Sequence, residues 1–140
     1  MTQAIAERPI YGMVDGAEVK VQVCIGVPYQ EGEGHWSCPY AFSVADPTVA
    51  LKSGTAGGVD GVQALLNALH GVGHVLDRSG IEWAMFSAEE AAADGVAFRE
   101  DGFPRADLNV MFLGTEFRTR MRSYVAGEAD QAMRARPGRA

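Results

Sequence analysis

Apolar and polar residues alternate along the first part of the chain, in the period of two that predicts strands with one buried face. Valine or isoleucine occupies every second position from Val19 to Val27. Asp15-Gly16 precedes this run, and Asp-Gly favours a two-residue type I′ turn because both of its positions need a positive φ. The pattern predicts a β-hairpin with three pairs in register: Val14 with Ala17, Gly12 with Val19, and Ile10 with Val21.

The alternation returns in residues 35–44, HWSCPYAFSV. Five side chains of this strand are expected to share one face and to join the core: Trp36, Cys38, Tyr40, Phe42 and Val44. Pro39 lacks an amide donor, so we expect the strand to lie at a sheet edge or to carry a bulge there. We expect a loop over residues 28–34 and a fourth short strand over Thr48–Lys52, after the Asp46-Pro47 turn.

The period changes to that of a helix after residue 58. Asp60 is the expected N-cap, with Gln63 three residues later, and Gly80 is the expected residue beyond the C-terminal end. The predicted helix therefore lies between Asp60 and Ser79. Its apolar stripe is expected to face the sheet: Val62, Leu65, Leu66, Leu69, Val72 and Leu76.

Weaker patterns follow. Ile81–Phe86 predicts a short strand or a core plug, and Ser87–Asp94 predicts a helical turn or two. A second helix is expected over Thr115–Ala135, with residues 132–140 frayed. This helix is expected to bury Phe117, Met121, Tyr124 and Val125. The fold class is therefore α+β: an antiparallel sheet of about four strands with one long helix packed on one face and a second C-terminal helix, in a single domain over residues 1–140.

The composition, 47% hydrophobic and 21% charged, is that of an ordinary soluble globular protein. The net charge of −6 is uneven, because residues 1–110 hold 15 acidic and 6 basic side chains (−9) and residues 111–140 hold 3 acidic side chains and 6 arginines (+3). The acidic body disfavours nucleic acid and anionic membranes as partners. The first residues lack the apolar region of a signal peptide, and no stretch approaches the ~18 apolar residues of a membrane span. With only two cysteines, these features predict a cytoplasmic protein with free thiols.

Three segments, VQVCIGVP, WSCPYAF and GGVDGVQALLNAL, carry the motifs V-x-I-G-x-P, W-x-C-P-Y and G-x-D-x-x-Q-A-L. Through these motifs, residues 19–80 resemble a family of small bacterial proteins catalogued as a domain of unknown function. The resemblance implies a compact, cytosolic, bacterial domain. It implies no activity and no functional residues.

His70 and His74 are the candidate metal ligands, because residues four apart on a helix can place two imidazoles on one ion. Both are expected on the polar side of the predicted helix, away from Leu65–Leu69. A zinc site needs a further ligand, which Asp77 or His35 could supply if the fold brings one of them near. The H-E-x-x-H pattern is absent, and two solvated histidines are the simpler interpretation.

Other chemistries have less support. Cys38 with His35 as its base would be a nucleophile, but the two lie on opposite faces of a regular strand, which favours a buried thiol. The glycine-rich residues 53–61 match no phosphate-binding motif, and Asp60 would occupy the helix N-terminus where an anion binds. A flexible connection is the simpler interpretation of these glycines. The arginines of the last helix spread around its axis, which disfavours nucleic-acid binding.

Two function hypotheses follow. The first is a noncatalytic module without a cofactor that binds a protein partner or pairs with itself as a homo-oligomer. The second is a metal-dependent enzyme that uses His70 and His74 to bind zinc. Stoichiometric zinc binding that is lost on His70→Ala would favour the second hypothesis.

Overall fold

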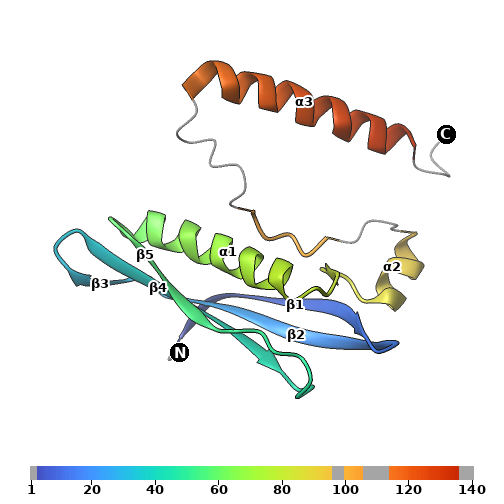
Figure 1. The fold of residues 1–140 in the computed structure, drawn as a ribbon, viewed down its shortest axis with the longest axis horizontal. Coiled ribbons are helices and arrows are strands. Elements are labelled where there is room, and N and C mark those ends of the chain that lie inside the picture. Colours follow the sequence, from blue (N-terminus) through green and yellow to red (C-terminus); the bar gives the residue numbers. More distant parts are fainter. Residues whose placement is uncertain (1–2, 96–99, 106–113, 136–140) are drawn as a thin grey trace. The chain divides into compact units, whose positions relative to one another are not determined.

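The computed structural model describes residues 3–95, 100–105 and 114–135. The chain forms two compact units, Met1–Ala106 and Asp107–Ala140, which we describe separately. The first unit contains a sheet with a long helix on one face, and the second contains a long helix (Figure 1). A single domain over residues 1–140 stays a prediction.

Six antiparallel strands form one sheet in the described part of the chain. They are β1 (Ala4–Val14), β2 (Ala17–Gly26), β3 (Tyr29–Gly32), β4 (His35–Val44), β5 (Gly54–Gly58) and β6 (Trp83–Ala84). Their order is β3-β4-β2-β1-β6, and β5 pairs with β4. The α+β class and the antiparallel sheet are confirmed, but the sheet has six strands instead of about four. The polar residues 29–32, predicted as a loop, form β3.

The predicted hairpin is confirmed in register. Asp15 and Gly16 have positive φ values of 49° and 78°. All three predicted pairs between β1 and β2 are present. Since a slip of one residue would turn the valines of β2 to the other face of the sheet, the turn also decides which side chains are buried.

β4 lies inside the sheet, because Tyr40 pairs with β2 on one side and with β5 on the other. The prediction that Pro39 marks an edge strand is therefore wrong. Where β2 gives way to β3, residues 26–28 stand opposite only residues 38–39 of β4. The extra residue belongs to the connection between β2 and β3, and the register of β4 with β2 and with β5 has no shift at Pro39. A bulge of β4 at Pro39 therefore stays a prediction.

The fourth predicted strand lies later in the chain than expected, in the glycine-rich residues of β5. Asp46 accepts hydrogen bonds from the backbone N and the hydroxyl of Thr48, at 2.8 and 2.6 Å, so a turn occupies the place where the strand was expected to begin. A Cβ at Gly58 would clash with the backbone of Ala64. The glycines therefore permit a close approach to the helix and do not form a flexible connection.

α1 (Gly61–Arg78) has the predicted ends. The Asp60 carboxylate accepts a hydrogen bond from the backbone N of Gln63 at 2.7 Å. Gln63 Oε1 in turn accepts one from the backbone N of Val59 at 2.8 Å. Gly80 follows the helix with a φ of 69°.

The buried face of α1 differs from the predicted stripe. Its buried residues are Ala64, Ala68, Val72, Gly73 and Leu76. Val62 and Leu66 of the predicted stripe are 69% and 44% exposed. Small side chains allow the helix to lie close to the sheet, so the helix turns its alanines inward and leaves two larger residues outside.

The core lies between α1 and the sheet. Its largest fully buried side chains are Ile10, Val21, Val23, Cys38, Val72 and Leu76. The five residues predicted for the inner face of β4 all belong to this core, with Cys38 fully buried and the others partly buried. The period-two pattern of β4 therefore identified its buried face correctly.

Two further helices are present. α2 (Ala88–Asp94) begins at a capping box of Ser87 and Glu90, and the backbone N of Ala88 donates to the Glu18 carboxylate at 2.7 Å. α3 (Gly114–Arg134) confirms the predicted C-terminal helix.

The predicted burial along α3 is wrong for two residues. Tyr124 and Val125 are 65% and 57% exposed, and Met121 is half-buried. The Phe117 side chain lies outside the described residues. Of the tail predicted to fray, residues 132–140, the first three belong to α3, and residues 136–140 lie outside the described part of the chain.

Candidate functional site

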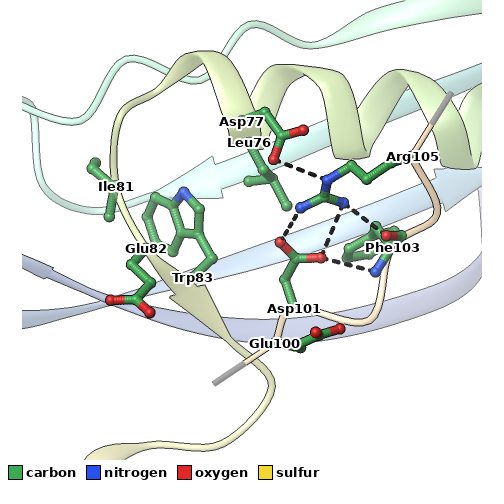
Figure 2. Close-up of a pocket in the computed structure, with 9 residues that line it drawn as sticks. All are labelled: Leu76, Asp77, Ile81, Glu82, Trp83, Glu100, Asp101, Phe103 and Arg105. Carbon is green, nitrogen blue, oxygen red and sulfur yellow. Dashed lines mark hydrogen bonds and ion pairs between the residues drawn. The ribbon is translucent and has the colours of Figure 1, made fainter. Parts of the chain in front are cut away.

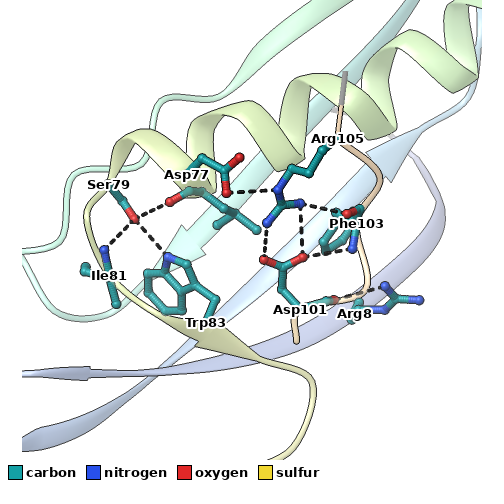
Figure 3. A network of polar contacts seen from close by, with 9 residues as sticks. Arg8, Asp77, Ser79, Ile81, Trp83, Asp101, Phe103 and Arg105 are labelled. Carbon is teal, nitrogen blue, oxygen red and sulfur yellow. Dashed lines mark hydrogen bonds and ion pairs between the residues drawn. The ribbon is translucent and has the colours of Figure 1, made fainter. Parts of the chain in front are cut away.

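Residues 100–105, which we call the strap, lie against β1, the end of β6 and α1 (Figure 3). The backbone O of Glu100 accepts a hydrogen bond from the backbone N of Met85 at 2.8 Å. The Pro104 carbonyl packs on Gly73 of α1, where a Cβ would clash with it. Glycine at position 73 therefore allows the strap to close onto the helix.

Asp101 holds the shape of the strap. Its side chain is only 8% exposed. Oδ1 accepts a hydrogen bond from the backbone N of Phe103 at 2.8 Å, and Oδ2 lies 2.6 Å from Arg105 Nη2. Arg105 Nη1 also donates to the Phe103 carbonyl at 2.7 Å. The buried carboxylate is thus both paired with a cation and hydrogen-bonded, as a buried charge must be.

Arg105 connects the strap to α1. Its Nε lies 2.9 Å from Asp77 Oδ1. The hydrogen bond to Asp101 raises the pKa of Arg105 against the opposing effect of burial, and the negative charges of Asp101 and Asp77 add to the rise. The guanidinium therefore stays charged between the two carboxylates.

Trp83 is held by a second polar network, at the end of α1. Its Nε1 donates to Ser79 Oγ at 3.0 Å (Figure 3). The same hydroxyl donates to the Leu76 carbonyl at 2.6 Å and accepts from the backbone N of Ile81 at 3.2 Å. Ser79 thus fixes both the turn after α1 and the position of the buried indole.

A pocket of about 310 Å³, which we call the acidic pocket, lies between the strap, β6 and the end of α1. Figure 2 shows Glu82 and Trp83 on one side of it and Asp101 and Arg105 on the other. Its lining consists of Leu76, Asp77, Ile81, Glu82, Trp83, Glu100, Asp101, Phe103 and Arg105.

The acidic pocket carries four carboxylates and one guanidinium. Arg105 pairs with Asp77 and Asp101. Glu82 and Glu100 are exposed, and no cation of the described residues pairs with either. The charged side chains of the described lining are therefore carboxylates and one guanidinium, which give the pocket an excess of negative charge.

His70 and His74 lie one turn apart on α1, as predicted. His74 is exposed, whereas His70 is half-buried, with a buried Nδ1 that has no hydrogen-bond partner in the described chain. No group of three or more potential metal ligands occurs among residues 3–95, 100–105 and 114–135. The fold therefore does not gather Asp77 or His35 with them, and zinc binding by the two histidines stays a prediction.

The two cysteines are free. Cys38 is fully buried, its Sγ donates to the Gly26 carbonyl at 3.4 Å, and burial raises the pKa of the thiol. His35 is exposed. Partial burial, followed by the charge of Glu7, raises the pKa of Cys24. Both cysteines are therefore protonated near neutral pH, which disfavours nucleophilic catalysis.

The sequence patterns did not identify the acidic pocket. The signal that was available is Asp101-Gly102-Phe103-Pro104, since an aspartate that accepts from the backbone two residues later forms a local turn. That pattern predicts a turn, and nothing in it indicates that the turn returns to α1 and β1.

A family model described as a domain of unknown function, DUF6968, matches residues 6–96. The match includes most of β1 and continues through α2, and it ends before the strap. No curated protein and no solved structure matches the chain. None of the described helices combines the length and the apolar character needed to cross a membrane. A cytoplasmic location stays a prediction.

Proposed function

The chain belongs to the DUF6968 family, and for this member we propose a noncatalytic role in which it binds a basic segment of a partner protein. A lysine or arginine side chain of the partner occupies the acidic pocket. The observation that carries the proposal is the pair of exposed carboxylates, Glu82 and Glu100, which lack a cation in the described chain beside a pocket with aromatic walls.

The pocket suits a long basic side chain. Its volume of about 310 Å³ is at the small end of the range for ligand pockets, roughly 300–1,000 Å³. Phe103, which is partly exposed, offers apolar surface to the methylene stem of lysine or arginine, while the exposed Glu82 and Glu100 attract the charged end. Such a side chain buries its stem and keeps its charge near water, so little desolvation opposes binding.

The charge of the surrounding unit supports the same class of partner. Residues 1–106 contain 14 acidic and 6 basic side chains, a net charge of −8. A negative field of this kind speeds the approach of a basic partner and repels an acidic one.

A second copy of this chain also carries a basic segment, because α3 contains Arg118, Arg120 and Arg122, of which Arg120 pairs with Glu116. Self-association of this kind would be weakened by salt and by replacing these arginines. Sedimentation of the full chain at low and high salt distinguishes this source from a different partner protein.

The test is calorimetric titration of the full chain with hexalysine at low salt. We expect binding that is weakened about tenfold in the double variant Glu82→Gln/Glu100→Gln, because two charge-assisted contacts become neutral. The matched control is Glu31→Gln/Glu33→Gln, in β3 and in the turn that follows it, which changes the net charge by the same amount away from the pocket. Equal weakening by both double variants would show general charge attraction and no role for the pocket.

A further inference from the structure

We propose that a second pocket, which shares Phe103 of the strap with the acidic pocket, binds a small monocarboxylate with a short apolar tail. The proposal does not rest on the proposed function of the acidic pocket, and the expected ligand carries the opposite charge. We call it the arginine pocket, because Arg8 supplies its cation.

The arginine pocket is small and mostly apolar. Its volume is about 170 Å³. Strands β1 and β2, helix α1 and the strap all contribute to it: Ala6, Glu7, Arg8, Val23, Ile25, Leu69, Gly102, Phe103 and Pro104. The sheet supplies a rigid floor, and the strap supplies one wall. A ligand here would therefore leave water for aliphatic and aromatic surroundings.

Arg8 is positioned for an anion by two contacts with the strap. Its Cζ lies 4.9 Å from the centroid of the Phe103 ring. Its Nη1 donates to the Asp101 carbonyl at 3.2 Å. Arginine has five N–H donors, and this hydrogen bond is the one that Arg8 makes among the described residues. The remaining donors can bind both oxygens of a carboxylate in the geometry that arginine favours.

Glu7 is the one carboxylate in the lining, and its oxygens are engaged by β2. Gln22 Nε2 donates to Glu7 Oε2 at 3.4 Å, and Cys24 Sγ donates to Glu7 Oε1 at 3.9 Å. Gln22 and Cys24 alternate along β2 with the buried Val21 and Val23, so they lie on the face of the sheet away from α1. The Glu7 carboxylate is thus held toward that face, and Arg8 dominates the charge of the pocket.

The size of the pocket limits the ligand. At the ~30 Å³ that each water occupies in the liquid, the volume corresponds to about six waters. A chain of several carbons with one carboxylate fills such a space. A second charge would be placed against Val23, Ile25 or Leu69, where nothing described could pair with it, so a dicarboxylate is disfavoured.

The test is titration of the ¹⁵N-labelled full chain with hexanoate, and with hexylamine as a probe of the same length and opposite charge. We expect hexanoate to shift the amide signals of Gly102 and Leu69 in a saturable way and hexylamine to leave them unchanged. Arg8→Gln should weaken hexanoate binding about tenfold or more, because a charge-assisted pair is lost. The matched control Arg78→Gln, at the exposed end of α1, should bind as the wild type does.

Leu69→Phe keeps the guanidinium and fills the pocket, so it should abolish binding even if Arg8→Gln fails to fold. Glu82→Gln/Glu100→Gln changes only the acidic pocket and should leave hexanoate binding intact. The proposal is overturned if Arg8→Gln and Leu69→Phe both bind hexanoate as the wild type does, or if hexylamine binds equally well.

Discussion

The sheet with α1 and the strap are held together in different ways, although they share a boundary. The sheet and helix are joined by apolar side chains, with Ile10, Val21 and Val72 fully buried between them. The strap is shaped by a buried carboxylate, Asp101, which pairs with Arg105 inside the strap. Polar contacts join it to the same body, from Arg105 to Asp77 of α1 and from Arg8 of β1 to the Asp101 carbonyl. Both candidate pockets lie where the strap meets the sheet and α1. They arise there because the polar strap does not fill the space beside the apolar core.

The two pockets differ because the strap presents different groups to each. On the side of α1 and β6 it offers Glu100 and Asp101, which make the first pocket acidic. On the side of β1 it offers Gly102 and Pro104, together with Phe103, which lines both pockets, and Arg8 is the dominant charge there. One six-residue segment therefore borders two pockets whose linings differ in charge.

The largest expected effect on stability comes from removing the indole of Trp83, which lies between α1 and the strap. Trp83→Ala should lower the free energy of unfolding by about 3–5 kcal/mol, as truncation of a buried aromatic side chain does. Trp83 is 3% exposed and packs over Gly12, so little can relax into the space. Chemical denaturation measures the change. Trp36→Ala is the comparison, and its smaller burial predicts a smaller loss; the reverse order would contradict the account of the core.

The buried carboxylate of the strap gives the next effect. Asp101→Asn should cost about 1–3 kcal/mol, because Arg105 loses a charged partner while the hydrogen bond from Phe103 can survive. The matched control is Asp130→Asn on α3, which also removes an i,i+4 pair with an arginine. Both of its members are largely exposed, so it should cost at most about 0.5 kcal/mol. If thermal unfolding shows the same loss of stability for both variants, the burial of Asp101 does not strengthen its pair with Arg105.

The contact between the strap and α1 is tested by one added methyl group. Gly73→Ala should destabilise the protein by roughly 1–2 kcal/mol, because the new Cβ meets the Pro104 carbonyl, which outweighs the gain in helix propensity. Gly127→Ala on α3 meets nothing within 4 Å and should stabilise its helix by up to about 1 kcal/mol. We therefore expect denaturation experiments to give changes in the free energy of unfolding of opposite sign for the two variants. If Gly73→Ala leaves this free energy unchanged, the strap does not pack on α1.

The smallest effect concerns the thiols of the sheet. Burial raises the pKa of Cys38 and, together with Glu7, that of Cys24. The folded state therefore holds these protons more tightly, and the stability they contribute is present at neutral pH and is lost as pH rises above the unfolded thiol value of about 8.5. Cys24→Ser should reduce this loss slightly in unfolding measured against pH. Alkylation should reach Cys24 before Cys38; faster alkylation of Cys38 would contradict its burial.

Local sequence patterns identified much of the core. They failed where contacts between distant residues determine which side chains are buried. The Asp15-Gly16 turn and the valines of β2 set the register of the first hairpin, since turn and alternation both lie within a few residues. The same reasoning took the large apolar residues of α1 as its buried face, and so it wrongly placed Val62 and Leu66 against the sheet. The helix instead faces the sheet with Ala64, because Gly58 of β5 allows the two backbones to come close together. This contact is visible only when the helix and the strand are packed.

The sequence by itself determined the α+β class, the hairpin register, both ends of α1 and the buried face of β4, because each depends on the order of neighbouring residues. Only the tertiary structure brought Asp101 and Arg105 to Asp77, placed Arg8 beside Phe103, and gave the glycine-rich residues a strand to pair with. These contacts join residues that are distant in the chain through charge, hydrogen bonds and close packing, and such contacts leave no periodic trace in the sequence.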